Sequence, residues 1–149
     1  MLPVSADHVV FTYGTLTDPD RVEEVLGPEP HTDRGSATLD GLHRVTGEYP
    51  TLAPSGRVDG RLLAVDSSGL LVLDDYEGVD RGLYVRCSVP CVLPAIEADE
   101  VWCYVGEPAA LGVDVEWPGT GSFDERVHDY LASAAVTVGP RGGTGDGRG

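Results

Sequence analysis

The stretch FTYGTLTDP, residues 11–19, decides how the chain begins to fold. Apolar and β-branched residues at 8–13 predict a β-strand that leads directly into it. Gly14 ends that strand, and Asp18 followed by Pro19 is a helix-start signal only four residues later. We therefore expect a strand, a sharp turn and a helix in immediate succession, with a short loop between the two elements.

That loop has the features of an anion-binding turn. Because glycine has no side chain, a ligand can approach the backbone closely at Gly14. The amides of Gly14, Thr15 and Leu16 can then point into a cleft as fixed donors, and consecutive amides beside a helix start suit a carboxylate or an oxyanion. The segment from Tyr13 to Leu16 is also typical of an ordinary strand-to-loop turn with a core tyrosine, so by itself it leaves both interpretations open.

Length and composition indicate one domain. The chain has 149 residues, 41% of them hydrophobic, which is enough for a single core. No apolar run approaches the ~18 residues of a membrane span, and no basic segment followed by an apolar stretch marks an export signal. We therefore expect a cytoplasmic protein with no membrane partner.

The chain is strongly acidic. It has 25 acidic and 10 basic residues, a formal net charge of -15, and every basic residue is arginine. A surface this negative repels nucleic acid and anionic membranes, so neither is an expected partner. The charge also exceeds the magnitude of roughly 2–8 that solubility of a small domain requires. Our hypothesis is adaptation to high salt, where screening weakens the repulsion between carboxylates; an acidic protein from an ordinary habitat is the alternative.

The cysteines Cys87, Cys91 and Cys103 are interpreted as small core side chains. Their odd number, in a chain without an export signal, argues against a disulfide framework. A zinc site would need further ligands, and the histidines are scattered without ligand spacing. These histidines are His8, His31, His43 and His128. We expect no metal.

Three helices are predicted from their end signals. The first covers 19–26, with Asp18 as its N-cap and Gly27 as its stop. The second lies in DSSGLLVLDDYEG, residues 66–78, where a serine is the expected cap and the final glycine ends the helix. The third begins at Ser122, because Ser-Phe-Asp-Glu is a capping box.

The remaining pattern predicts a strand-dominated α+β domain. After the strand at 8–13, the expected strands are 34–46, 58–66, 83–93 and 99–105, and the segment EYPTLAPSG between the first two of these is expected to be a turn. Strands and helices do not alternate regularly, so about six strands in a curled, barrel-like sheet are expected rather than a doubly wound parallel sheet. The domain is expected to cover 1–137, and the Gly-rich tail at 138–149 to be disordered.

A second informative stretch is LDDYEGVDRGLYVR, residues 73–86. It places Glu77 at a helix C-terminus, where the helix dipole disfavours negative charge. Nearby carboxylates disfavour its ionisation further; they belong to Asp74, Asp75 and Asp80. If Glu77 points into an apolar cleft, its pKa is raised and it can act as a base; a solvated loop carboxylate is the alternative. The helix register predicts that Asp74 and Asp75 lie off the cleft.

Four motifs together resemble the γ-glutamylcyclotransferase-like family, which includes the AIG2-like proteins. They are YGTL at 13–16, YPTL at 49–52, VDGRLLAV at 58–65, and LDDYEG at 73–78 followed by LYVR. The resemblance covers about residues 8–106 in the family's order. It implies a small mixed β-barrel with a few flanking helices. It also implies an enzyme that cyclises the glutamyl part of a γ-glutamyl amine or amide to 5-oxoproline and releases the free amine.

The resemblance implies roles for individual residues. Tyr13, Gly14, Thr15 and Leu16 match the family's loop, which binds the glutamyl group through backbone amides, and Glu77 matches its acid/base. The implied enzyme is an amine-lyase or acyltransferase that uses no cofactor, and its implied partner is a small γ-glutamyl substrate.

Tyr49, Tyr84 and Tyr104 are further candidates for the pocket lining. Tyr49 is equally typical of a core residue. Strand alternation places Tyr84 and Arg86 on one face, and we interpret Arg81 and Arg86 as solvated strand charges.

The chain also departs from the family pattern. Thr17 follows Leu16, where many relatives carry a basic residue, so a basic contact to substrate from that position is missing. The YGTL form resembles the γ-glutamylamine and AIG2-like branch more than the glutathione-degrading or γ-glutamyl-amino-acid branches. Two alternatives stay open: a non-catalytic binding or regulatory module, and a biosynthetic lyase step that removes a γ-glutamyl protecting group.

Overall fold

One curled, six-stranded sheet organises the part of the chain that the computed structural model describes, residues 8–45, 50–93 and 99–140. The strand order is β4-β5-β1-β3-β2-β6. The strands are β1 (His8–Thr12), β2 (His31–Val45), β3 (Thr51–Val65), β4 (Tyr84–Pro90), β5 (Glu100–Gly106) and β6 (Thr137–Gly139). The helices are α1 (Pro19–Leu26), α2 (Ser67–Glu77), α3 (Pro108–Leu111) and α4 (Phe123–Ser133), with short 3-10 turns η1 (Thr15–Thr17) and η2 (Val79–Arg81).

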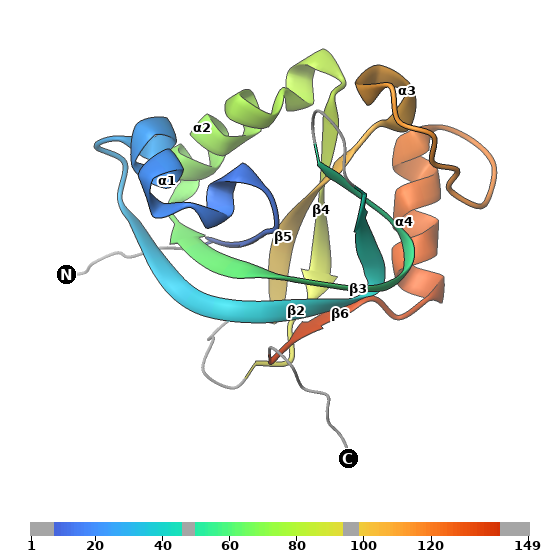
Figure 1. The fold of residues 1–149 in the computed structure, drawn as a ribbon, viewed down its shortest axis with the longest axis horizontal. Coiled ribbons are helices and arrows are strands. Elements are labelled where there is room, and N and C mark those ends of the chain that lie inside the picture. The colour runs from blue at the N-terminus through green and yellow to red at the C-terminus, as the bar shows by residue number, and fades with distance from the viewer. Residues whose placement is uncertain (1–7, 46–49, 94–98, 141–149) are drawn as a thin grey trace.

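The sheet is mixed and forms a half-barrel. β1 pairs antiparallel with β3 and parallel with β5, so the first strand lies in the middle of the sheet. Figure 1 shows that the long strands β2 and β3 are strongly curved. The helices α1 and α2 lie close together on one side of the sheet, and α4 lies on the other side. The predicted α+β fold with about six strands and flanking helices is confirmed. None of the described helices is long and apolar enough to span a bilayer.

Two apolar clusters lie on the two faces of the sheet. Val10 and Phe11 of β1 point to opposite faces because side chains alternate along a strand. Val10 packs in the cluster beneath α1 and α2, which includes Leu70 and Leu73 of α2. Phe11 packs in the other cluster, together with Val127 of α4. The end of β1 is therefore held from both sides, and the loop that follows it starts from a fixed position.

The end signals of α1 and α4 are confirmed, and the cap of α2 is corrected. The Asp18 carboxylate accepts from the Asp20 amide at 3.0 Å, and the Ser122 capping box is formed. At the start of α2 the side chain that accepts from the Gly69 amide, at 2.9 Å, belongs to Asp66, so the predicted serine cap is wrong. Asp66 stands one residue before the serines, in the extended conformation that a cap needs.

The predicted turn between β2 and β3 is also wrong, because residues 51–56 belong to β3. Ser55 and Gly56 have positive φ values of 83° within this strand, and the pairing of β2 with β3 shifts between Asp40 and Leu42. The Tyr130 hydroxyl of α4 stabilises this irregularity: it accepts from the Ser55 amide at 2.8 Å and donates to the Gly41 carbonyl at 2.7 Å. The prolines and glycine that predicted a turn are accommodated in a bulged strand instead.

The C-terminal boundary lies beyond the predicted one. β6 pairs antiparallel with β2, and Val138 and Gly139 are buried, although both were expected in the disordered tail. The remaining tail, residues 141–149, lies outside the described residues. α3 and β6 were not predicted, because each is too short to show a periodic pattern.

Two of the three cysteines lie within strands of the sheet. Cys87 and Cys103 stand opposite each other in the β4–β5 ladder and are buried, and burial raises the pKa of both thiols. Cys91 is half-buried beyond the end of β4, and all three cysteines are free. Within the described ranges there is no cluster of three or more metal-ligating side chains.

Candidate functional site

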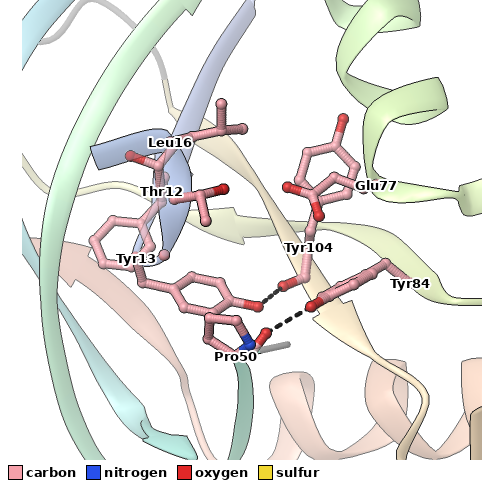
Figure 2. Close-up of a pocket in the computed structure, with 10 residues that line it drawn as sticks. Thr12, Tyr13, Leu16, Pro50, Glu77, Tyr84 and Tyr104 are labelled. Atoms are coloured by element: carbon pink, nitrogen blue, oxygen red, sulfur yellow. Dashed lines mark hydrogen bonds between the residues drawn. The ribbon is translucent and has the colours of Figure 1, made fainter. Parts of the chain in front are cut away.

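A small cavity of about 40 Å³ lies between the loop that follows β1 and the C-terminal end of α2. Figure 2 shows Glu77 and Tyr104 on one side of it, Thr12, Tyr13 and Leu16 on the other, and Pro50 and Tyr84 closing one end. The lining residues are Phe11, Thr12, Tyr13, Gly14, Thr15, Leu16, Pro50, Glu77, Tyr84 and Tyr104. Segments far apart in the sequence therefore meet at one site.

The loop presents backbone donors. The first hydrogen bond of η1 runs from the Thr17 amide to the Gly14 carbonyl at 3.1 Å, and the Thr17 hydroxyl donates to the same carbonyl at 2.7 Å. The amides of Thr15 and Leu16 precede that first bond, so they have no acceptor within the turn. A Cβ added at Gly14 would lie 3.2 Å from Pro50 Cγ, so a side chain at this position requires Pro50 to shift by a few tenths of an ångström.

Three tyrosine hydroxyls brace the cavity walls. Tyr13 donates to the Tyr104 carbonyl, and Tyr84 donates to the Pro50 carbonyl at 2.6 Å (Figure 2). The Tyr104 hydroxyl donates to Asp74 Oδ1 of α2 at 2.6 Å. Burial raises the pKa of Tyr13 and Tyr104, so both remain neutral donors at neutral pH. These bonds connect β1, β4, β5 and α2 around the site.

Glu77 lines the cavity, and its shifted pKa allows it to exchange a proton near neutral pH. It is the last residue of α2, and burial raises its pKa from 4.5 to about 7. Desolvation causes this shift, as expected for a glutamate that points into an apolar cleft, whereas the contribution expected from the neighbouring carboxylates is not among its causes. Asp75 and Asp80 are exposed, and Asp74 is paired with Arg86, which offsets its charge.

The prediction for the charged residue Arg86 is wrong, whereas those for Asp74 and Arg81 are confirmed. Arg86 is not a solvated strand charge: its Nε lies 2.8 Å from Asp74 Oδ1, and its guanidinium carbon lies 4.2 Å from the centre of the Trp102 ring. Asp74 does not line the cavity, as predicted, but it accepts the hydroxyl of Tyr104, which does. Arg81 is exposed, as predicted.

Comparison with known proteins decides the family. Residues 10–124 match the family model described as gamma-glutamyl cyclotransferase, AIG2-like. The chain belongs to this family. It is 33% identical over 141 residues to AIG2-like protein C of Arabidopsis thaliana, covering 87% of this chain and 75% of that protein.

Solved structures of AIG2-like and cyclotransferase proteins share the fold. An AIG2-like protein from Mus musculus is 25% identical, with a TM-score of 0.52 over 73% of this chain and 85% of that one. A protein described as gamma-glutamyl cyclotransferase is 14% identical, with a TM-score of 0.56 over 84% of this chain and 98% of that one. At that identity the second likeness supports the fold alone.

In this AIG2-like chain, the residues predicted from the motifs converge on one cavity. Tyr13, Gly14, Thr15, Leu16 and Glu77 all line it. The lining candidates Tyr84 and Tyr104 line it as well, and Tyr49 lies outside the described residues.

Three lining residues were not predicted: Phe11, Thr12 and Pro50. Phe11 and Thr12 directly precede the YGTL motif, and Pro50 is part of YPTL. Their proximity to these motifs was the signal that could have identified them.

Proposed function

We propose that this protein is a cofactor-independent γ-glutamylcyclotransferase that converts the glutamyl part of a γ-glutamyl amine or amide to 5-oxoproline and releases the free amine. One observation carries the proposal: a half-buried carboxyl with a pKa of about 7 lines the same cavity as a loop of backbone donors. The reaction needs a base for an ammonium group and an anchor for a carboxylate, and Glu77 and the loop match these two needs.

The loop is proposed to bind the substrate's α-carboxylate. The amides of Thr15 and Leu16 are donors without a partner inside η1, and α1 begins just beyond, at Pro19. A helix N-terminus adds a favourable field for an anion. Anchoring the carboxylate here and folding the glutamyl chain brings the amine close to its own γ-carbonyl, as closure of a five-membered ring requires.

Glu77 is proposed to carry the proton through the reaction. Its carboxylate accepts a proton from the substrate's α-ammonium, and the freed nitrogen lone pair attacks the γ-carbonyl carbon. As the bond from that carbon to the leaving nitrogen breaks, Glu77 returns the proton to the departing amine. The ring nitrogen then loses its second proton to the Glu77 carboxylate, which passes it to the released amine. One C–N bond forms, one breaks, the amine leaves as an ammonium ion, and no proton is gained or lost overall. A pKa of about 7 suits a group that must both accept and donate at neutral pH.

A panel of γ-glutamyl compounds tests this proposal. The panel contains γ-glutamyl amines, γ-glutamyl amino acids and glutathione, each incubated with the protein at low and high salt. Release of 5-oxoproline with an equal amount of free amine, detected by mass spectrometry, is the expected result. Tight binding without product would favour a non-catalytic binding module instead. If the protein neither binds nor turns over any compound of the panel, the proposal is contradicted.

A further inference from the structure

A largely buried ion pair lies one helical turn from Glu77. Asp74 precedes Glu77 by three residues in α2, and side chains at this spacing are neighbours on a helix surface. The Asp74 and Arg86 side chains are only 18% and 24% exposed, with 2.8 Å between Asp74 Oδ1 and Arg86 Nε. The Arg86 Nε forms no hydrogen bond of good geometry with any described acceptor, so the contact is chiefly electrostatic.

Both members of the pair are fixed by residues of the sheet. Arg86 stacks on Trp102 of β5 at 4.2 Å, and Asp74 accepts the Tyr104 hydroxyl at 2.6 Å. Arg86 and Tyr104 are directly opposite in the β4–β5 ladder, so they share one face of the sheet. The pair therefore ties the last turns of α2 to the strands that line the cavity.

The other groups around Glu77 are neutral or exposed. Tyr13, Cys103 and Tyr104 interact electrostatically with Glu77, and burial raises the pKa of each, so they carry no charge at neutral pH. Other ionisable groups on the elements around the site are Tyr84 of β4, which lines the cavity, and the half-buried Tyr76 of α2. The exposed ones are Asp20, Arg21, Glu23, Glu24, Asp75, Asp80 and Arg81. Asp74 and Arg86 are therefore the charged side chains near Glu77 that are largely shielded from solvent, while the raised pKa of Glu77 itself is caused by burial.

We propose that Asp74 and Arg86 form a neutralising pair that positions Glu77 and keeps the cavity free of net charge, a role that rests on the proposed function of Glu77 as the base. Without Asp74, the Arg86 cation stabilises the Glu77 carboxylate and makes it a weaker base. Without Arg86, the Asp74 carboxylate repels that of Glu77 and keeps it protonated. Each charge alone would move the pKa of Glu77 away from neutral pH, and the two charges would move it in opposite directions.

The Glu77 carboxyl can be titrated by carbon-13 NMR in the full chain without substrate. Asp74→Asn is expected to lower the Glu77 pKa by about one unit, and Arg86→Gln to raise it by about one unit. The double variant Asp74→Asn/Arg86→Gln removes both charges and is expected to titrate close to the wild type. The matched control is Asp75→Asn, which makes the same charge change on the same helix at an exposed position.

Opposite shifts in the two single variants, with return in the double variant, would establish the neutralising role. Shifts no larger than that of Asp75→Asn, or in the same direction for both variants, would overturn it. If Asp74→Asn does not fold, the upward shift in Arg86→Gln and the wild-type-like titration of the double variant decide the question. The proposed function is tested separately: with the predicted shifts present, a wild type that releases no 5-oxoproline would contradict the proposed activity alone.

Discussion

The Tyr76 hydroxyl lies 2.8 Å from Thr15 Oγ1 and thereby joins the last turn of α2 to the loop that follows β1. Arg21 of α1 donates to the same hydroxyl at 3.3 Å. Tyr76 immediately precedes Glu77, so one phenol connects the two halves of the candidate site, the donor loop and the carboxyl.

Tyr76→Phe removes this connection and should loosen the loop relative to Glu77. One net hydrogen bond is worth about 0.5–1.5 kcal/mol, so we expect the affinity for a γ-glutamyl ligand to fall by roughly 2- to 10-fold. Titration calorimetry measures this change. Asp75→Asn is the control, because it changes an exposed side chain on the same helix. An unchanged affinity in Tyr76→Phe would show that the phenol does not hold the loop.

Gly14→Val should abolish ligand binding while the sheet stays folded. The first carbon of any side chain at this position lies 3.2 Å from Pro50 Cγ, and the two methyl groups of valine must then displace Pro50 or fill the cavity. Gly14→Ala adds one methyl group and should weaken binding less. Calorimetry and circular dichroism measure the two properties; wild-type affinity in a folded Gly14→Val protein would remove the loop from the site.

Glu77 should make the stability of the protein depend on pH in a specific direction. The folded-state pKa is about 7 against 4.5 in the unfolded chain, so between these values the folded protein retains a proton that the unfolded chain has lost. The free energy of unfolding therefore falls as pH rises through this range. Below pH 4.5, Glu77→Gln should have the same free energy of unfolding as the wild type. At about pH 8 it should be more stable by up to about 3 kcal/mol. Denaturant unfolding at several pH values measures this difference, and parallel pH profiles would contradict it.

Replacing Cys87, Cys91 and Cys103 with alanine should change stability rather than activity. Cys87 and Cys103 are almost completely buried, so each replacement leaves a small cavity and should lower the free energy of unfolding by about 1–2 kcal/mol. Turnover by the folded fraction should stay close to that of the wild type. Stoichiometric zinc in the purified wild type, lost in the triple variant, would instead show a metal site.

Helix ends were predictable because their signals are local. Asp18, Pro19 and Gly27 lie within or beside α1, and Ser122 and Glu125 complete a capping box inside four residues. No distant contact is needed to form these caps, so the sequence is sufficient to place them.

The bulged part of β3 and the short strand β6 were not predictable in this way. Ser55 and Gly56 remain in a strand because Tyr130, far along the chain, hydrogen-bonds across the bulge. β6 is formed by pairing with β2, which begins about a hundred residues earlier. Propensity alone favours turns at these positions, and tertiary contacts override it.

The motif residues of the candidate site were predictable from the sequence, whereas the contacts of the residues around them were not. The motifs place Gly14 and Glu77 correctly at one cavity. Arg86 was expected to be solvated because its partner, Asp74, approaches it only after α2 packs on the sheet. Helix register alone could not show that Asp74 accepts the Tyr104 hydroxyl.

Turnover by Glu77→Gln is the most direct test of the proposed chemistry. Glutamine keeps the shape and hydrogen-bonding capacity of the side chain but cannot accept the proton from the substrate amine. General acid–base groups contribute about 10²–10⁴-fold, so 5-oxoproline release should fall by that order while ligand affinity is largely retained. Asp75→Asn removes a nearby carboxylate at an exposed position of the same helix and should keep near-normal turnover. Near-normal turnover by Glu77→Gln, or an equal loss in Asp75→Asn, would contradict the assignment of Glu77 as the acid/base.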